Sequence, residues 1–457
     1  MIMAGVTKKI GEGLFYSSLG NLVIKGISLV GYLLMVNRLA PHDYGVFLLV
    51  VSLTAPVLAL STFGFDRLLV SAFSQFRGQG EWGKARGLFR EYSLCFVAIL
   101  AICISGQFLL REWLIPRSDI YLLNFFLPYL ILLLGQAFFN LVLIYCEANE
   151  MFRRSSSLQV LEPILRTGLV VFFLNRLDIS LLLIIYGGAK LVPAIVGWIN
   201  LQFFSVKSDQ SNMISERGVL YAVFRQRGKW EMLKNVCDNL ISPWKTWVIK
   251  LVINVETVAV WDFAQNLYSA ILGFFPIKAV LFPIISRIIS DRELASRITI
   301  KARKYATIFY LFSFVVGGIA LKFLLHYYFL NYAAQYWLIM LVVAHLFIES
   351  YRIGQVALLH ALNQQKYMFQ MYPIFLGLEL VLYVSFSLLG GFVGYILAWH
   401  LIVFLAGYIY DRRLRQYLPI GLNHWRSFLT FDQYDRWLWQ KIGDRFRLIL
   451  SRVSYGK

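Results

Sequence analysis

Long apolar runs separated by short polar breaks dominate the chain. Runs of about 20 residues have the length needed to cross about 30 Å of hydrocarbon at about 1.5 Å per helical residue. We predict twelve membrane-spanning helices, with approximate limits 14–36, 44–64, 88–110, 121–145, 157–175, 180–204, 231–253, 257–285, 304–325, 334–359, 370–389 and 392–410. The pattern therefore predicts an all-α polytopic membrane protein.

The composition supports this interpretation. Apolar residues make up 59% of the chain and charged residues only 15%, whereas soluble domains are about a quarter charged. Before the first apolar run stands "MIMAGVTKKIGEG", which lacks a small-residue cleavage site, so we expect a retained helix and not a signal peptide.

The net charge of +19 follows the predicted topology. Most Lys and Arg residues fall in alternate loops, and the positive-inside rule then places both termini in the cytoplasm. Basic cytoplasmic loops are expected to contact anionic membrane lipids, and this placement argues against a nucleic-acid partner. The densest basic groups are Arg67, Arg77, Lys84, Arg86 and Arg90; Lys207, Arg217, Arg225, Arg227 and Lys229; and Arg287, Arg292, Arg297, Lys301, Arg303 and Lys304.

A long interior polar break divides the predicted helices six and six. We therefore predict a cytoplasmic N-terminus (1–13), an N-lobe (14–204), a cytoplasmic linker (205–230), a C-lobe (231–410) and a basic tail (411–457). A weak internal echo supports the division, since "VNRLAPHDYGVF" and "VINVETVAVWDFAQ" each end one apolar helix and open the next. Two repeated lobes with the substrate at their interface are a common transporter design.

The tail differs in kind from the rest. Apolar residues recur there at intervals of three or four, which predicts an amphipathic helix on the cytoplasmic leaflet. They are Tyr434, Leu438, Ile442, Phe446, Ile449 and Val453. The alternative is a docking surface for a biosynthetic partner such as a glycan polymerase.

We find no sequence pattern that indicates enzyme chemistry. Cys95, Cys103, Cys146 and Cys237 have neither disulfide nor metal spacing, no P-loop occurs, and the predicted external loops are short. We expect no metal site and no cofactor, and we predict a transporter rather than an enzyme.

Charged residues inside the predicted helices are the main candidates for function. A charge at mid-bilayer costs at least about 2.5 kcal/mol, so it normally faces water or a partner. Lys25 lies about 11 residues into the first helix, or about 16 Å deep, and Lys190 in "YGGAKLVP" reaches a similar depth. Lys250 and Lys322 lie near helix ends and are expected to snorkel.

Several of these charges can be neutralised within their own helix. Arg166 follows Glu162 by four residues and Arg352 follows Glu349 by three, spacings that favour ion pairs. The predicted seventh helix carries Lys234, Asp238 and Lys245 on one face.

Basic side chains outnumber acidic ones in this set, which favours an anionic substrate. The predicted substrate-binding residues are Lys25, Arg166, Lys190, Lys234, Lys245, Lys278 and Arg352, set against the carboxylates of Glu162, Asp238, Glu349 and Glu379. Asp238, Glu162 and Glu379 are also candidates for binding a coupling proton or sodium ion. Structural ion pairs remain the alternative for each of these groups.

Three stretches resemble a known family. "NLVIKGISLVGYLLMVNRLAPHDYGVFLLVVSL" is similar to the opening of the Wzx-type polysaccharide flippases of the multidrug/oligosaccharidyl-lipid/polysaccharide exporter superfamily, including the turn "NRLAPHDYG". "STFGFDRLLVSAFSQFRGQGEWGKAR" and "VWDFAQNLYSAILGFFPIKAVLFPIISRI" resemble later stretches of the same family. The likeness covers about residues 14–410, and Ala40 departs from it where a glycine-containing turn is commoner.

This resemblance implies a MATE-like fold of twelve helices in two six-helix lobes that works by alternating access. It also implies transport of an undecaprenyl-pyrophosphate-linked oligosaccharide across the bacterial inner membrane. Two alternatives remain open: a multidrug or organic-cation exporter of the same fold, which would need unpaired carboxylates, and a membrane glycan polymerase or ligase, which would need a long external loop.

Overall fold

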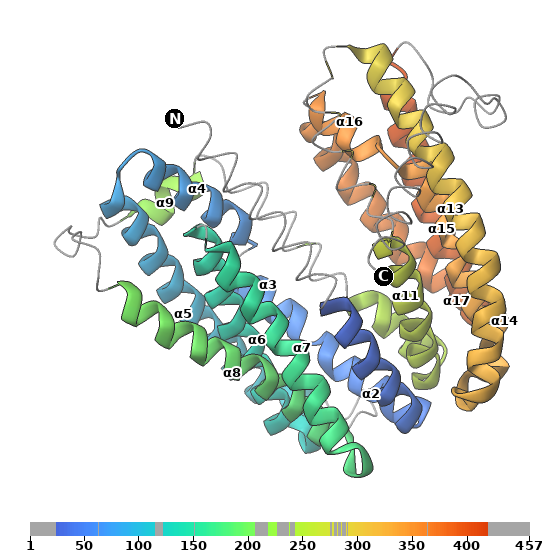
Figure 1. The fold of residues 1–457 in the computed structure, drawn as a ribbon, viewed down its shortest axis with the longest axis horizontal. Helices are drawn as coiled ribbons and strands as arrows, with labels where there is room; N and C mark the ends of the chain where they lie inside the picture. Colours follow the sequence, from blue (N-terminus) through green and yellow to red (C-terminus); the bar gives the residue numbers. More distant parts are fainter. Residues whose placement is uncertain are drawn as a thin grey trace, which may run out of the picture. The chain divides into compact units, whose positions relative to one another are not determined.

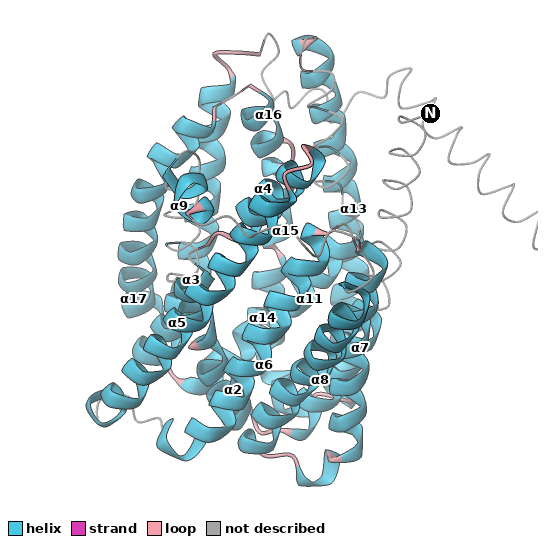
Figure 2. Ribbon diagram, turned by 90° about the vertical axis from the view of Figure 1, so that its left-hand side faces the viewer, coloured by secondary structure: helices cyan, strands magenta, loops and turns pink. Residues whose placement is uncertain are grey.

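The computed structural model describes most of the chain. The described residues are 24–62, 64–114, 122–149, 151–205, 218–225, 237, 243–274, 277, 281, 285, 289, 291–362 and 364–418. No strand occurs within these ranges, and Figure 2 shows helices joined by short loops. The predicted all-α fold is therefore confirmed.

The helices follow the apolar runs closely. They are α2 (Pro41–Ser52), α3 (Thr54–Thr62), α4 (Asp66–Gly78), α5 (Trp82–Leu114), α6 (Leu122–Ala148), α7 (Phe152–Phe172), α8 (Ile179–Ser205), α9 (Val219–Val223), α11 (Val255–Phe274), α13 (Arg292–Tyr327), α14 (Tyr336–Val343), α15 (His345–Arg352), α16 (Gln355–Ala361) and α17 (Gln365–Leu414), with 3-10 turns η2 (Leu174–Arg176) and η4 (Leu330–Gln335). Residues 24–38 and 243–252 are also helical.

Seven segments of the described chain are long and apolar enough to cross a membrane, which identifies a multi-pass membrane protein. They are Pro41–Thr62, Trp82–Leu109, Phe125–Ala148, Ile179–Ile199, Arg292–Tyr327, Leu330–Ala361 and Lys366–Leu414. Helix α7 overlaps the predicted helix 157–175 but is not among these seven, and it carries Arg153, Arg154, Glu162 and Arg166. The total of twelve stays a prediction.

Glycine and proline set the positions where helices begin and break. Helix α2 begins at Pro41, whose missing N–H is not needed in a first helical turn. Helix α17 is interrupted at Gly390 and Gly391, and Gly391 has φ +56°, a left-handed conformation that favours glycine. This break lies at the junction of the predicted helices 370–389 and 392–410.

The chain forms two compact units. Unit 1 comprises Met1–Asn266, Leu321–Val342 and Glu379–Ala398, and unit 2 comprises Leu267–Ala320, Val343–Leu378 and Trp399–Lys457. The predicted lobes 14–204 and 231–410 stay a prediction. The predicted amphipathic helix at 424–457 lies outside the described residues, as does most of the linker 205–230.

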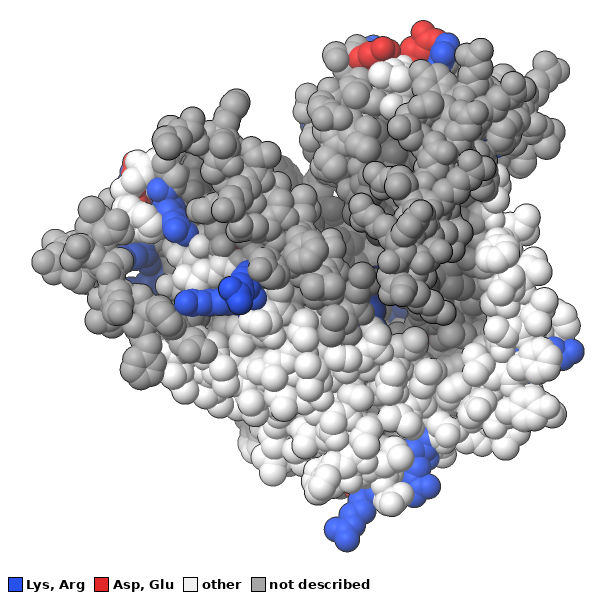
Figure 3. All heavy atoms as spheres, in the orientation of Figure 1, with Lys and Arg blue, Asp and Glu red and all other residues white. Residues whose placement is uncertain are grey.

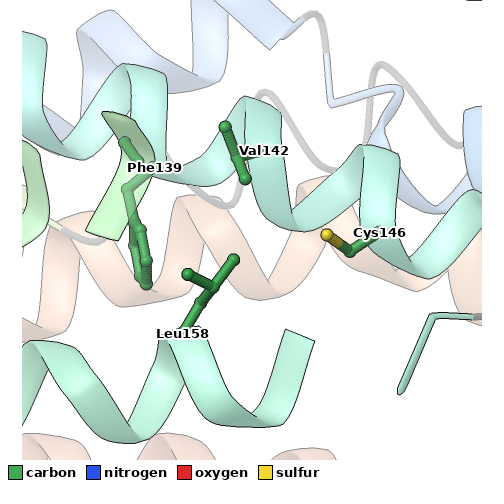
Figure 4. Close-up of a cluster of buried hydrophobic side chains, with 5 residues drawn as sticks. Phe139, Val142, Cys146 and Leu158 are labelled. Atoms are coloured by element: carbon green, nitrogen blue, oxygen red, sulfur yellow. The ribbon is translucent and has the colours of Figure 1, made fainter. Parts of the chain in front are cut away.

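In unit 1, α6, α7 and α8 lie side by side (Figure 1). A cluster of buried apolar side chains joins these helices, and Figure 4 shows four of them: Phe139, Val142 and Cys146 from α6 and Leu158 from α7. Cys146 is thus a small buried side chain in this core. The four cysteines are free.

Two glycines bring the backbones of α6 and α8 into direct contact. A Cβ atom at Gly187 would lie only 2.6 Å from backbone atoms of Ile131 and Leu132, and one at Gly135 would meet the carbonyl of Gly187. Small residues allow such close approach between membrane helices. This contact positions the side chains that follow on both helices.

In unit 2, a buried ion cluster ties α13 to α17. Arg303 and Asp411 are each 1% exposed, and their charged groups lie 3.7 Å apart. Arg303 Nε donates a hydrogen bond to the carbonyl of Ile353, and Arg415 lies 3.3 Å from the other oxygen of Asp411. Removing either Arg303 or Asp411 would therefore leave the other as a buried charge without its closest buried partner, which is costly.

On the face drawn in Figure 3, most of the described surface is neither acidic nor basic. Large apolar side chains are also exposed on several helices, such as Leu109 on α5 and Phe172 on α7. An exposed apolar surface of this kind suits contact with lipid rather than water.

Candidate functional site

Arg166 is the centre of the first polar group in unit 1. Its Nε lies 3.2 Å from the carboxylate of Glu162, one turn earlier on α7, as the spacing predicts. Its second guanidinium nitrogen donates a 2.9 Å hydrogen bond to the hydroxyl of Ser28, and its guanidinium lies 4.8 Å from the ring centroid of Tyr186 on α8. Arg166 is therefore held by groups from three helices.

Lys190 lies on α8, three residues after Gly187. Its ammonium group donates a hydrogen bond to the side-chain oxygen of Gln136 on α6. Because Gly135 and Gly187 let the two backbones approach, Gln136 is carried next to Lys190. Within the described residues no carboxylate lies within 4 Å of Lys190, so its partner is a neutral amide.

Lys25 lies in the helical stretch 24–38, one turn before Ser28. Its side chain is exposed, and it makes no ion pair within the described residues. Lys25 and Lys190 thus share the property that neither forms an ion pair with a carboxylate of the described chain.

Lys245 forms an ion pair that helix spacing alone could not predict. Its ammonium lies 3.1 Å from the carboxylate of Glu379 on α17. The same ammonium lies 5.8 Å from the ring centroid of Tyr383, which stacks on Tyr395 at 4.7 Å. The hydroxyl of Tyr395 in turn donates a hydrogen bond to the carbonyl of Lys245.

Arg352 belongs to unit 2. It lies 3.8 Å from Glu349, one turn earlier on α15, as its spacing predicts. The two ion pairs that helix spacing predicts, Glu162 with Arg166 and Glu349 with Arg352, are therefore both present. Three of the predicted residues, Lys234, Asp238 and Lys278, lie outside the described residues.

The ion pairs make Glu162 and Glu379 weaker candidates for binding a coupling ion. Glu162 and Glu379 each have a basic side chain within 3.2 Å, which already supplies the positive charge that a bound cation would bring. No group of three or more His, Cys, Asp or Glu residues in the described chain could hold a metal ion.

Asp262 is a membrane carboxylate that our sequence analysis missed. It lies on α11, inside the predicted helix 257–285, and counting it reduces the excess of basic over acidic side chains from three to two. The hydroxyl of Tyr44 and the amide nitrogen of Asn266 donate hydrogen bonds to it, at 2.5 and 2.8 Å. The signal was present in "VWDFAQN", where a lone acid interrupts an apolar run.

Comparison with known proteins agrees with the architecture. The chain is similar to a multidrug resistance MATE family transporter of the MOP superfamily in an inward-facing conformation, with 15% identity over 88% of this chain and 99% of the other and a TM-score of 0.66. It is also similar to the lipid II flippase MurJ in an inward closed conformation, with 14% identity over 97% and 99% of the two chains and a TM-score of 0.64.

A third structure of the same kind is the Vibrio cholerae MATE transporter VcmN in its bent form, at 16% identity, 90% and 98% coverage and a TM-score of 0.57. At these identities the likeness establishes the fold. These similar structures are transporters and a flippase, not enzymes. No curated protein matches the chain.

The sequence itself identifies the family. A family model described as "Polysaccharide biosynthesis protein" matches residues 10–289, more than half of the chain. The chain therefore belongs to the polysaccharide biosynthesis protein family and has the fold of the MOP-superfamily transporters and flippases.

Proposed function

We propose that the protein is a flippase that moves an undecaprenyl-pyrophosphate-linked oligosaccharide across the bacterial inner membrane by alternating access. Membership of a polysaccharide biosynthesis family, combined with a transporter fold, supports this proposal. The structural observation that carries it is Lys190, a membrane lysine whose described partner is the neutral amide of Gln136.

The chemistry of the substrate fits this arrangement. A lipid-linked glycan carries a negatively charged diphosphate through hydrocarbon while its polyprenyl tail stays in the lipid. A lysine that lacks a carboxylate partner keeps its charge available for that diphosphate. Ammonium groups bind phosphate as point charges without fixed bidentate geometry, which suits a substrate that must leave again. Among the predicted substrate-binding residues that the structure describes, Lys25 and Lys190 have this property, and Arg166 adds a third positive charge held in place by Glu162.

The distribution of Lys and Arg supports cytoplasmic termini and contact between the cytoplasmic loops and anionic lipids. The basic tail after residue 411 is a candidate surface for a glycan polymerase or another protein of the same pathway.

Complementation of a deletion strain tests the function. The wild-type chain should restore surface glycan, whereas Lys25→Ala and Lys190→Ala should restore much less at equal abundance in the membrane. Lys322→Ala is the matched control, because Lys322 is an exposed lysine near the end of α13 and should behave as wild type. Full activity of both Lys25→Ala and Lys190→Ala would reject the assignment of the site.

The same strain separates the alternatives. A flippase defect leaves lipid-linked repeat units on the cytoplasmic face, whereas loss of a polymerase leaves them on the outer face. Increased drug susceptibility with normal surface glycan would instead identify an organic-cation exporter.

A further inference from the structure

Two segments far apart in the sequence meet at Tyr44 and Asp262. Tyr44 belongs to the turn "NRLAPHDYG" and Asp262 to "VWDFAQN", and 218 residues separate them. The hydroxyl of Tyr44 donates a 2.5 Å hydrogen bond to a carboxylate oxygen of Asp262. Both residues lie within unit 1.

The packing around this hydrogen bond is close. A Cβ atom at Gly45, next to Tyr44, would meet the backbone carbonyl of Val255 at the start of α11, so only glycine allows this approach. Phe263, next to Asp262, stacks on Tyr32 with ring centroids 6.3 Å apart and on Tyr332 at 5.1 Å. The two segments therefore form one packed seam, which we call the Tyr44–Asp262 seam.

The groups that face Asp262 are neutral at physiological pH. They are Tyr44 from α2, Asn266 from α11, and, within electrostatic range, Tyr32 from the helical stretch 24–38, Tyr332 from η4 and Tyr186 from α8. Within the described residues, no basic side chain lies within 4 Å of Asp262.

This environment differs from that of four other carboxylates on the described helices. Glu162, Glu349, Glu379 and Asp411 each have an Arg or Lys within 4 Å. A carboxylate with a cationic partner stays ionised, whereas one held only by neutral donors in apolar surroundings gains less from its charge. Asp262, held by neutral donors in a closely packed seam, is thus suited to take up and release a proton.

The predicted orientation of the chain determines on which side of the membrane the seam lies. The positive-inside rule places the turn between the first two helices, and the start of α11, on the external side. A transporter that works by alternating access must separate contacts on this side to release its substrate.

We propose that Asp262 is a proton-binding site whose ionised form holds the Tyr44–Asp262 seam closed on the external side and whose protonation releases it. This proposal rests on the transport function proposed above. An ionised carboxylate accepts hydrogen bonds about twice as strong as those of a neutral group. Protonation therefore weakens the bonds from Tyr44 and Asn266 together, and the seam loses its polar attachment while its aromatic packing remains.

The accessibility of a buried position on α11 tests the seam directly. Ala259 is fully buried one turn before Phe263, so a cysteine placed there reports opening through its reaction with a membrane-impermeant maleimide added outside. The full-length Ala259→Cys chain is labelled in intact cells between about pH 8 and about pH 5, a range that spans the titration of a buried carboxyl. Labelling is corrected for the signal of the parent chain and expressed relative to the reaction of a free thiol at the same pH, because the thiolate that reacts with maleimide becomes scarcer as pH falls.

Labelling of this chain should be slow at the higher pH and severalfold faster at the lower. Adding Asp262→Asn, which mimics the protonated carboxyl, should make labelling fast at both. Adding Tyr44→Phe removes the donor and should also raise labelling at the higher pH. The matched control is Asp66→Asn, because Asp66 also accepts a hydrogen bond from a tyrosine, Tyr92, in the same unit, and it should leave labelling unchanged.

A wild-type dependence of labelling on pH in the Asp262→Asn chain would overturn the proposal, since His42, Asp43 or Glu256 near the same end would then be responsible. Equal effects of Asp66→Asn and Asp262→Asn would also overturn it. The readout requires no substrate. A chain that shows the expected labelling but moves no lipid-linked glycan therefore disproves the proposed function and leaves the seam intact.

Discussion

The ammonium group of Lys245 lies 3.1 Å from the carboxylate of Glu379, although 134 residues separate them in the sequence. Each charge satisfies the other inside a predicted membrane helix, where a lone ion is costly. The pair connects the helical stretch 243–252 to α17, and the ring of Tyr383 lies beside it. Because the two charges neutralise each other, the loss of either side chain should lower the stability of the folded protein.

Replacing Glu379 with Gln should destabilise the protein by about 1.5–3 kcal/mol, because Lys245 loses a charged hydrogen-bond partner. The midpoint of thermal unfolding in detergent measures this effect. The double variant Lys245→Met/Glu379→Gln should be more stable than the Glu379→Gln single variant, since no unpaired charge remains. If the stability lost by the double variant equals the sum of the losses measured for Glu379→Gln alone and for Lys245→Met alone, the two side chains are not coupled.

Changing Gln136 to Glu should weaken transport without reducing the amount of protein in the membrane. A carboxylate at this position would pair with Lys190, so less positive charge would remain for an anionic substrate. The expected result is a higher substrate concentration for half-maximal transport in proteoliposomes. Gln136→Met, which removes the hydrogen bond but adds no charge, is the control and should keep the affinity closer to wild type.

Gly187→Ala should destabilise the contact between α6 and α8 by about 1–3 kcal/mol, as overpacking of a filled interface commonly does. A methyl group there would lie 2.6 Å from the backbone of Ile131 and Leu132. The neighbouring Gly188→Ala supplies the control, because nothing lies within 4 Å of a Cβ atom at Gly188. Unfolding midpoints of the two variants should differ clearly; equal midpoints would mean that the two helices are not in close contact.

Stability should depend on pH through Asp66, at the start of α4. Burial raises the pKa of this carboxyl above its ordinary value of about 3.9, although hydrogen bonds from Tyr92 and Thr62 oppose the shift. The folded state then binds the proton more tightly than the unfolded state, so stability is greatest below the ordinary pKa and falls as pH rises through the raised pKa.

Asp66→Asn should remove this part of the pH dependence, because an amide does not titrate. The measurement is the unfolding midpoint of both chains across mildly acidic to neutral pH. Parallel curves for the wild type and the variant would show that other groups cause the dependence.

Local geometry explains which parts of the site the sequence could predict. Glu162 and Arg166 are neighbours because residues four apart share a helix face, and Glu349 and Arg352 follow from the same rule at three. The position of Gly390 and Gly391 between two apolar runs likewise predicts the break in α17. These relationships need only one helix at a time.

Contacts between distant helices could not be predicted in this way. The pairing of Lys245 with Glu379 depends on how two helices are rotated and how far each is displaced along its axis, and apolar periodicity fixes neither. Asp262 itself stands out in the sequence as a lone acid in an apolar run, but its pairing with Tyr44 could not be predicted because the two residues come from distant parts of the chain. The contact of Gln136 with Lys190 could not be predicted either, because a single uncharged amide in an apolar helix does not by itself indicate a functional site.

The backbone contact between α6 and α8 has a mechanical consequence for Lys190. Gly187 precedes Lys190 by three residues and Gly135 adjoins Gln136. The ammonium and the amide are therefore carried by two helices whose backbones touch close to both residues. Helix α6 cannot slide along α8 without a steric clash between their main-chain atoms. In the proposed transport cycle Lys190 and Gln136 would therefore move together as one rigid unit, and a negatively charged substrate would meet the same pair of groups in the inward-facing and in the outward-facing state.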